Sequence, residues 1–228
     1  MLHVLLIHGA GGGGWEWNVW RRVLQAHGMT AHAPDVQPAA TGLAKTSLQD
    51  YAGQVRDALR ALPRPRVAVG ASLGGLLVLR NADAADALVL VNPLPPAPWH
   101  ARLPAREWPE IVPWQVQARL ASTGKAMPDA YAVNVLYAHR HWCDESGLAL
   151  SQAHAGVEIA QPACPLLLVL SAQDDDVPPS AGRELAAAWR ASVIETAATS
   201  HVGPLFGRDA AFAAEQAALW LRGLRLDR

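Results

Sequence analysis

Short apolar runs alternate along the chain with stretches in which apolar residues recur every three or four positions. The runs predict buried strands, and the stretches predict helices that bury one face. Strands are expected at 2–7, 29–34, 66–69, 87–91, 165–171 and 192–197, and helices at 15–27, 47–62, 73–80, 181–190 and 210–221. This alternation is typical of an α/β fold with a mainly parallel sheet and helices on both faces.

The alternation stops after the fourth apolar run. Residues 92–113 contain seven prolines, which exclude a continuous helix or a central strand. Helical spacing returns at 114–120 and over all or parts of 127–150, and aromatic residues are too frequent there for a disordered linker. We therefore expect a core formed by 1–92 and 162–228, with a small proline- and tryptophan-rich lid inserted at 93–161.

Residues 70–74 read Gly-Ala-Ser-Leu-Gly and fit the pattern Gly-x-Ser-x-Gly. The pattern lies between a predicted strand and a predicted helix, so it predicts a tight, strained turn. Such a turn presents the hydroxyl group of Ser72 at the carboxyl edge of the sheet, where open α/β sheets bind ligands. Ser72 is the predicted nucleophile. The alternative is a glycine-rich turn in which the serine only caps the helix.

A serine hydroxyl needs a base to remove its proton. His201 is the candidate, because it lies in a loop after the last predicted strand. A carboxylate must orient the imidazole, and three aspartates follow the strand at 165–171. Asp174 lies nearest the strand end and is preferred, while Asp175 and Asp176 stay open. The chain order serine, aspartate, histidine agrees with a nucleophile on a strand-to-helix turn.

An oxyanion hole would need two backbone N–H donors. The amide of Leu73, directly after the nucleophile, is one candidate, and the amide of Ala10, in the loop after the first strand, is the other. The glycines at 11–14 lack the Gly-Lys-Ser/Thr ending of a phosphate-binding loop. No cofactor is expected.

Residues 8–17, His-Gly-Ala-Gly-Gly-Gly-Gly-Trp-Glu-Trp, resemble the His-Gly-Ala-x-x-x-x-Trp-x-Trp opening of the plant methylesterase and hydroxynitrile lyase group of α/β-hydrolases. Residues 171–178 are similar to the group's acid motif Gly-x-x-Asp-x-x-Val-Pro, which favours Asp174. Ser200 and His201 match its histidine segment. The resemblance implies the α/β-hydrolase fold and serine hydrolase chemistry.

Two positions favour ester hydrolysis over lyase chemistry. Hydroxynitrile lyases of the group carry a lysine after the histidine and usually a threonine after the glycine-alanine pair, where this chain has Val202 and Gly11. We therefore expect a hydrolase that cleaves small or medium carboxylic esters. Other chemistry on the same residues (thioester, amide or carbon–carbon bond hydrolysis, or cyanohydrin cleavage) and a non-catalytic ligand-sensing role are the alternatives.

The composition of the chain limits the classes of molecule that it is expected to bind. The formal net charge of −1 gives no long-range field for nucleic acid or an anionic membrane. The N-terminus lacks a secretory signal, and no stretch is long enough to span a membrane. Two cysteines are too few for a disulfide framework, and the residues His139, His141 and Cys143 favour packing over a metal site. We expect a cytoplasmic monomer or homodimer that acts on a small molecule without a metal.

Overall fold

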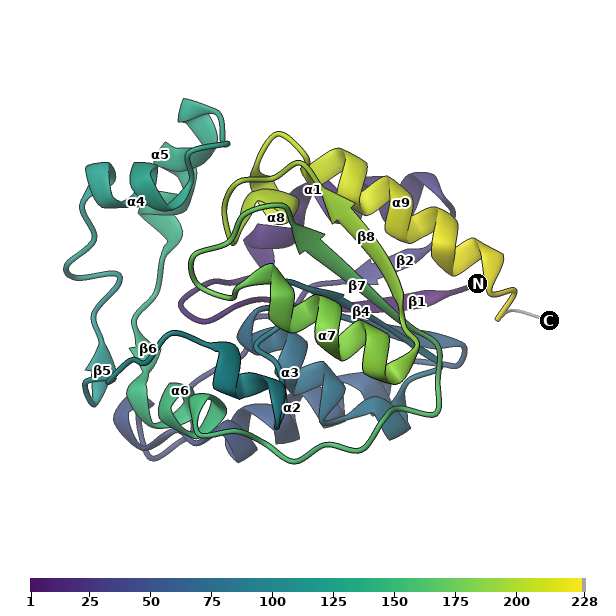
Figure 1. Ribbon diagram of the computed structural model, residues 1–228, viewed down its shortest axis with the longest axis horizontal. Helices are drawn as coiled ribbons and strands as arrows, with labels where there is room; N and C mark the ends of the chain where they lie inside the picture. The colour runs from purple at the N-terminus through teal and green to yellow at the C-terminus, as the bar shows by residue number, and fades with distance from the viewer. Residues whose placement is uncertain (227–228) are drawn as a thin grey trace.

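The computed structural model describes residues 1–226, and its centre is a six-stranded parallel sheet (Figure 1). The strand order is β2-β1-β3-β4-β7-β8, and each neighbouring pair is parallel. The strands are β1 (His3–Ile7), β2 (Thr30–His32), β3 (Arg66–Ala71), β4 (Ala87–Val91), β7 (Leu166–Ser171) and β8 (Ser192–Thr196). Every strand expected from the apolar runs is present, so the predicted fold class is confirmed.

Helices cover both faces of the sheet because successive strand residues point to opposite sides. Leu5 and Ile7 pack into one apolar cluster and Val4 and Leu6 into the other. The first cluster is closed by α2 (Leu48–Ala61), α3 (Leu73–Leu79) and α7 (Pro179–Trp189), and the second by α1 (Asn18–Ala26), α8 (Gly203–Phe206) and α9 (Ala210–Gly223). Figure 1 shows the two groups of helices on either side of the strands.

Local sequence signals fix where α2 begins and ends. The Ser47 hydroxyl oxygen accepts a hydrogen bond from the backbone N–H of Asp50 at 3.2 Å, and the Asp50 carboxylate accepts one from the N–H of Ser47 at 2.8 Å. This reciprocal cap satisfies two N–H groups that a helix start otherwise leaves unpaired. The helix ends at Ala61, two residues before Pro63, which cannot donate to a helical hydrogen bond.

The segment between β4 and β7 departs from the expectation. It contains α4 (Leu120–Ala126), α5 (Ala132–His141), α6 (Gly147–His154) and a two-stranded antiparallel pair, β5 (Ile111–Val112) with β6 (Glu145–Ser146). The helix predicted at 114–120 is wrong: residues 114–116 form a turn, where the Asp144 carboxylate accepts the N–H groups of Gln115 and Val116 at 2.8 and 3.4 Å, and α4 begins only at Leu120. The helix predicted over 127–150 is divided, because β6 pairs with β5 in its middle.

The lid helices occupy two different environments. In Figure 1, α4 and α5 stand apart from the sheet, whereas α6 lies beside α2. Ala149, Leu150 and Ala153 of α6 belong to the apolar cluster that α2 and α3 close. The division of the chain into core and lid stays a prediction. Within residues 1–226, no helix is both long enough and apolar enough to cross a membrane.

Candidate active site

Ser72 forms the turn between β3 and α3. Its backbone angles are φ 50° and ψ −119°, a region that costs a non-glycine residue on the order of 1–3 kcal/mol. Three hydrogen bonds hold it there: its N–H donates to the carbonyl of Val91 at 3.0 Å, and its carbonyl accepts from the N–H groups of Gly75 and Leu94, both at 3.0 Å. The surrounding structure therefore imposes the strained conformation that the motif predicts.

The two glycines of the motif allow this turn to pack closely. A Cβ atom on Gly70 would lie 2.2 Å from the carbonyl oxygen of Gly74. A Cβ atom on Gly74 would lie 2.3 Å from the carbonyl oxygen of His8, at the end of β1. Neither position has room for any side chain, so the serine is held against the loop that follows β1.

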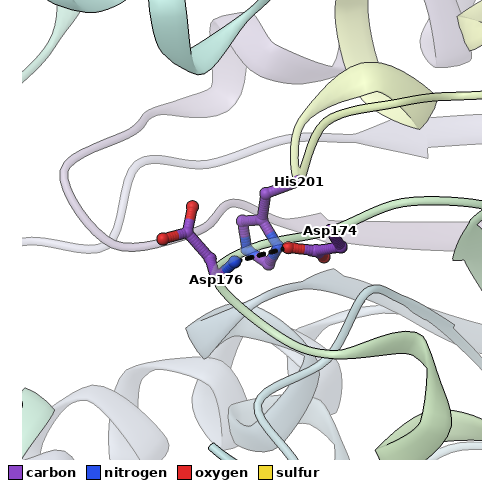
Figure 2. Close-up of side chains that lie close together, drawn as sticks. All are labelled: Asp174, Asp176 and His201. Atoms are coloured by element: carbon purple, nitrogen blue, oxygen red, sulfur yellow. Dashed lines mark hydrogen bonds and ion pairs between the residues drawn. The ribbon is translucent and has the colours of Figure 1, made fainter. Parts of the chain in front are cut away.

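His201 and Asp174 meet at this edge of the sheet. The Nδ1 atom of His201 lies 2.6 Å from Oδ2 of Asp174 (Figure 2). The Asp174 side chain is fully buried, and its Oδ1 atom accepts the N–H groups of Asp176 and Val177, both at 2.9 Å. The carboxylate is therefore fixed in place and directed at the imidazole. The structure thus brings Asp174, of the three aspartates, into direct contact with His201.

The other two aspartates are placed differently. Asp175 is exposed, and the Asp176 carboxylate accepts a hydrogen bond from Nη2 of Arg106 at 2.6 Å. Atoms of Asp174, Asp176 and His201 lie within 4.8 Å of one another and could in principle hold a cation. In the structure Nδ1 of His201 is paired with Asp174, and Asp176 is paired with Arg106, so the atoms that would face a cation are bonded to protein groups.

Charge around His201 favours its protonated form. Burial alone would lower the pKa of the imidazole, but the nearby charge and hydrogen bond of Asp174 and the charges of Asp176 and Glu16 outweigh it. The net effect raises the pKa above its ordinary value of 6.5. An imidazole in this environment is a stronger base than a free one.

A buried polar network behind the histidine was missed in the sequence analysis. The Asn92 side-chain amide donates to the carbonyl of His201 at 2.7 Å and to the hydroxyl of Ser171 at 2.8 Å. The Ser171 hydroxyl in turn donates to the carbonyl of Ser200 at 2.7 Å. Asn92 directly follows β4 and precedes Pro93, and a polar residue at the end of a buried strand was the available signal.

The lid also contacts the histidine loop. Asp129, between α4 and α5, accepts the Ser200 hydroxyl at 2.6 Å and the N–H of Thr199 at 2.8 Å. A Cβ atom on Gly203 would lie 2.4 Å from the same carboxylate. No local pattern around Asp129 indicated this role, because its partners lie about 70 residues further along the chain.

The N–H groups of Ala10 and Leu73, the predicted oxyanion donors, differ from the N–H groups next to Ala10 because they have no acceptor among the described residues. The N–H of Gly9 donates to Glu16 at 3.1 Å and the N–H of Gly11 donates to Glu145 at 3.0 Å. Within residues 1–226, neither the N–H of Ala10 nor that of Leu73 has a hydrogen-bond acceptor. These two amides therefore remain for a ligand, one in the loop after β1 and one directly after Ser72.

Two buried ionisable side chains, those of Glu16 and His8, contact the loop that follows β1. Glu16 is 2% exposed, and burial raises the pKa of its carboxyl group to about 7 against the opposing effects of the Gly9 N–H and of His201. His8 accepts the N–H of Val36 at Nε2 and contacts the carbonyl of Gly9 through Nδ1, and burial lowers its pKa. His8 is thus a neutral structural residue. An ionisable residue between the half-buried Trp15 and the buried Trp17 was the available signal for Glu16.

The lid tryptophans pack in pairs against the core and each other. Trp108 and Trp114 make an edge contact at 6.1 Å between ring centroids, and Trp99 makes one with Trp189 at 5.3 Å. A Cβ atom on Gly11 would lie 2.3 Å from the Trp114 ring. Trp114 therefore covers the loop that carries Ala10.

The sequence matches the model of the alpha/beta hydrolase family over residues 4–215. No curated protein matches the chain. The structure is similar to polyneuridine aldehyde esterase (TM-score 0.75, 15% identity, 97% of this chain and 99% of that chain covered). It is also similar to the methylesterase MES16 from Arabidopsis (0.73, 14%, 98% and 99%) and to a pyrethroid hydrolase from Sphingobium faniae JZ-2 (0.73, 20%, 98% and 97%). At these identities the structural likeness shows the fold alone.

Proposed function

The chain belongs to the alpha/beta hydrolase family, and on that premise we propose that it is a serine hydrolase that cleaves small or medium carboxylic esters through an acyl-enzyme on Ser72. The observation that carries the proposal is the 2.6 Å contact between Nδ1 of His201 and the buried carboxylate of Asp174. Because Nδ1 is engaged by Asp174, Nε2 of the same ring is the nitrogen that would accept and donate the proton. A strained serine turn at the same sheet edge supplies the nucleophile.

The proposed reaction has two symmetrical halves. Ser72 attacks the ester carbonyl while Nε2 of His201 takes its proton, and Asp174 stabilises the imidazolium that forms. The N–H groups of Ala10 and Leu73 bind the oxyanion. The imidazolium then protonates the departing alcohol, and water attacks the acyl-enzyme with the same base. The raised pKa of His201 supports its role as the base.

Three features support an ester as the substrate. The residue after the histidine is Val202, and the residue after Ala10 is Gly11, where hydroxynitrile lyases of the related group carry lysine and usually threonine. Of the structural neighbours named above, one is called an esterase, one a methylesterase and one a pyrethroid hydrolase. Trp114 packs on Gly11, next to the proposed oxyanion donor Ala10, and Trp108 contacts Trp114, which supports an apolar substrate. A cytoplasmic location and a monomeric or dimeric state belong to the same proposal.

The test compares wild-type protein with Ser72→Ala and His201→Ala on p-nitrophenyl esters of increasing acyl length. We expect each variant to lose turnover by orders of magnitude while its thermal unfolding temperature stays near that of wild type. A fluorophosphonate probe should label wild-type protein at Ser72. Near-normal turnover by either variant would refute the proposal. Faster turnover of thioesters, amides, mandelonitrile or carbon–carbon substrates would keep the residues and replace the ester.

A further inference from the structure

We propose that two buried glutamates, Glu145 from the lid and Glu16 from the core, are positioning residues that aim the N–H of Ala10 at the oxyanion. The inference rests on the proposed function and extends it to residues outside the predicted set. The two carboxylates accept the N–H groups on either side of Ala10 and leave the middle one free.

Glu145 joins three parts of the molecule. Its residue is 5% exposed. One carboxylate oxygen accepts the Tyr51 hydroxyl of α2 at 2.6 Å and the N–H of Ser146 at 2.7 Å, and the other accepts the N–H of Gly11 at 3.0 Å. Three donors satisfy this buried charge, so it holds a single orientation. Burial and, to a smaller extent, the charge of Glu145 raise the pKa of the Tyr51 hydroxyl, so Tyr51 stays a hydrogen-bond donor.

Gly11 is held by the lid at both of its backbone groups. Its carbonyl accepts the N–H of Cys143 at 2.8 Å, and its N–H donates to Glu145 at 3.0 Å. Its φ angle of +67° lies in the left-handed region that favours glycine, and the Trp114 ring occupies the space of a side chain. The segment at 143–145 therefore determines the direction of the peptide plane between Ala10 and Gly11.

Glu16 holds the other side of the loop. Its carboxylate accepts the N–H of Gly9 at 3.1 Å. A Cβ atom on Gly9 would lie 3.3 Å from Cβ of Ser72 and 3.9 Å from this carboxylate. Gly9 is thus packed between the proposed nucleophile and Glu16. The peptide plane that carries the N–H of Ala10 also carries the carbonyl of Gly9, which accepts the N–H of Gly12 at 3.2 Å. With the planes on both sides held by the two glutamates and this carbonyl paired, the N–H of Ala10 cannot turn inward without breaking a hydrogen bond of the loop.

Shortening Glu145 tests the idea while keeping its charge. In Glu145→Asp the carboxylate is one methylene shorter. The bond to its own neighbour, Ser146, is local, and the Tyr51 side chain can follow the carboxylate. The N–H of Gly11 belongs to a fixed loop and is lost first. Removing an oxyanion donor outright costs about 10²–10³ in kcat, and a displaced donor should cost on the order of 10- to 100-fold.

The readouts separate positioning from general damage. We expect kcat on a p-nitrophenyl ester to fall while KM stays within about threefold of wild type. The inhibition constant of an alkyl boronic acid, whose adduct with serine places an oxygen in the oxyanion hole, should rise by the factor by which kcat/KM falls. Glu110→Asp is the matched control, an exposed lid glutamate next to β5. A kcat within about twofold of wild type in folded Glu145→Asp, or a loss confined to KM, overturns the inference.

Glu16 provides a second test if Glu145→Asp fails to fold. Glu16→Gln keeps an oxygen for the N–H of Gly9, whereas Glu16→Leu removes the acceptor and leaves an apolar group in a buried site. We expect kcat to be higher in the glutamine variant than in the leucine variant, and equal values overturn the inference. Wild-type turnover by Ser72→Ala would overturn the proposed function together with this inference. An inactive Ser72→Ala beside a fully active Glu145→Asp overturns only the positioning role.

Discussion

Replacing Glu16 by glutamine should change how the stability of the protein depends on pH. Burial raises the pKa of this carboxyl group from its ordinary 4.5 to about 7 in the folded protein. Between these two values the folded state holds a proton that the unfolded state has released. The free energy of unfolding of wild-type protein therefore falls as pH rises through this range. Glutamine resembles the neutral carboxyl group at every pH and lacks this loss.

The size of the effect follows from the two pKa values. A difference between 4.5 and about 7, at about 1.4 kcal/mol per pKa unit, gives a full effect of about 3 kcal/mol. Most of it develops between pH 5 and pH 8, where we expect Glu16→Gln to gain about 2–3 kcal/mol relative to wild type. Solvent does not screen this carboxyl group appreciably, because Glu16 is only 2% exposed.

Urea unfolding followed by circular dichroism at pH 5, 6, 7 and 8 measures this difference. Other groups titrate in both proteins, and the comparison of variant with wild type removes most of their contribution. Glu158→Gln, at an exposed position, is the control and should track wild type throughout. Parallel curves for Glu16→Gln and wild type would refute the reasoning, as would a variant that loses stability relative to wild type as pH rises.

Two further predictions concern the serine turn and the histidine. Gly74→Ala should lower the free energy of unfolding by about 3 kcal/mol in urea titrations, because its Cβ would meet carbonyl oxygens at the end of β1; Gly53→Ala, with open space in α2, should add about 0.5–1 kcal/mol. Asp176→Asn should shift the acidic limb of the pH profile of kcat/KM to lower pH, because the charge of Asp176 raises the pKa of His201. Asp175→Asn should leave that limb unmoved.

Residues close together in sequence explain what could be predicted. Strands of a parallel sheet are buried on both faces, so β3, β4 and β7 appear in the sequence as short, nearly continuous apolar runs. The buried helix α3 is a run of the same kind, and its place after the Gly-x-Ser-x-Gly turn is what identifies it as a helix. The turn at Ser72 needs glycine two residues before and two residues after the serine, so five consecutive residues are enough to predict it. Asp174 could be preferred over its two neighbours because reach from a strand end is a local geometric quantity. These signals placed three side chains on one edge of the sheet.

The remaining features depend on partners that lie far apart in sequence. Glu145 contacts Gly11 across 134 positions, and Asp129 contacts Ser200 across 71. In the stretch expected to be a helix at 114–120, the turn at 114–116 is held by Asp144, almost thirty positions away, which accepts the N–H groups of Gln115 and Val116. Hydropathy patterns report how deeply a residue is buried, and they carry no information about which distant amide a buried carboxylate will accept.

Asp129 attaches the α4–α5 segment to the histidine loop, and Glu145 attaches the β6 segment to the first loop. A chimaera that exchanged the whole insertion for one from a relative would therefore lose one anchor of the loop that carries His201 and one of the loop that carries Ala10. Efforts to broaden what this enzyme accepts should keep these two acids and redesign the surfaces between them.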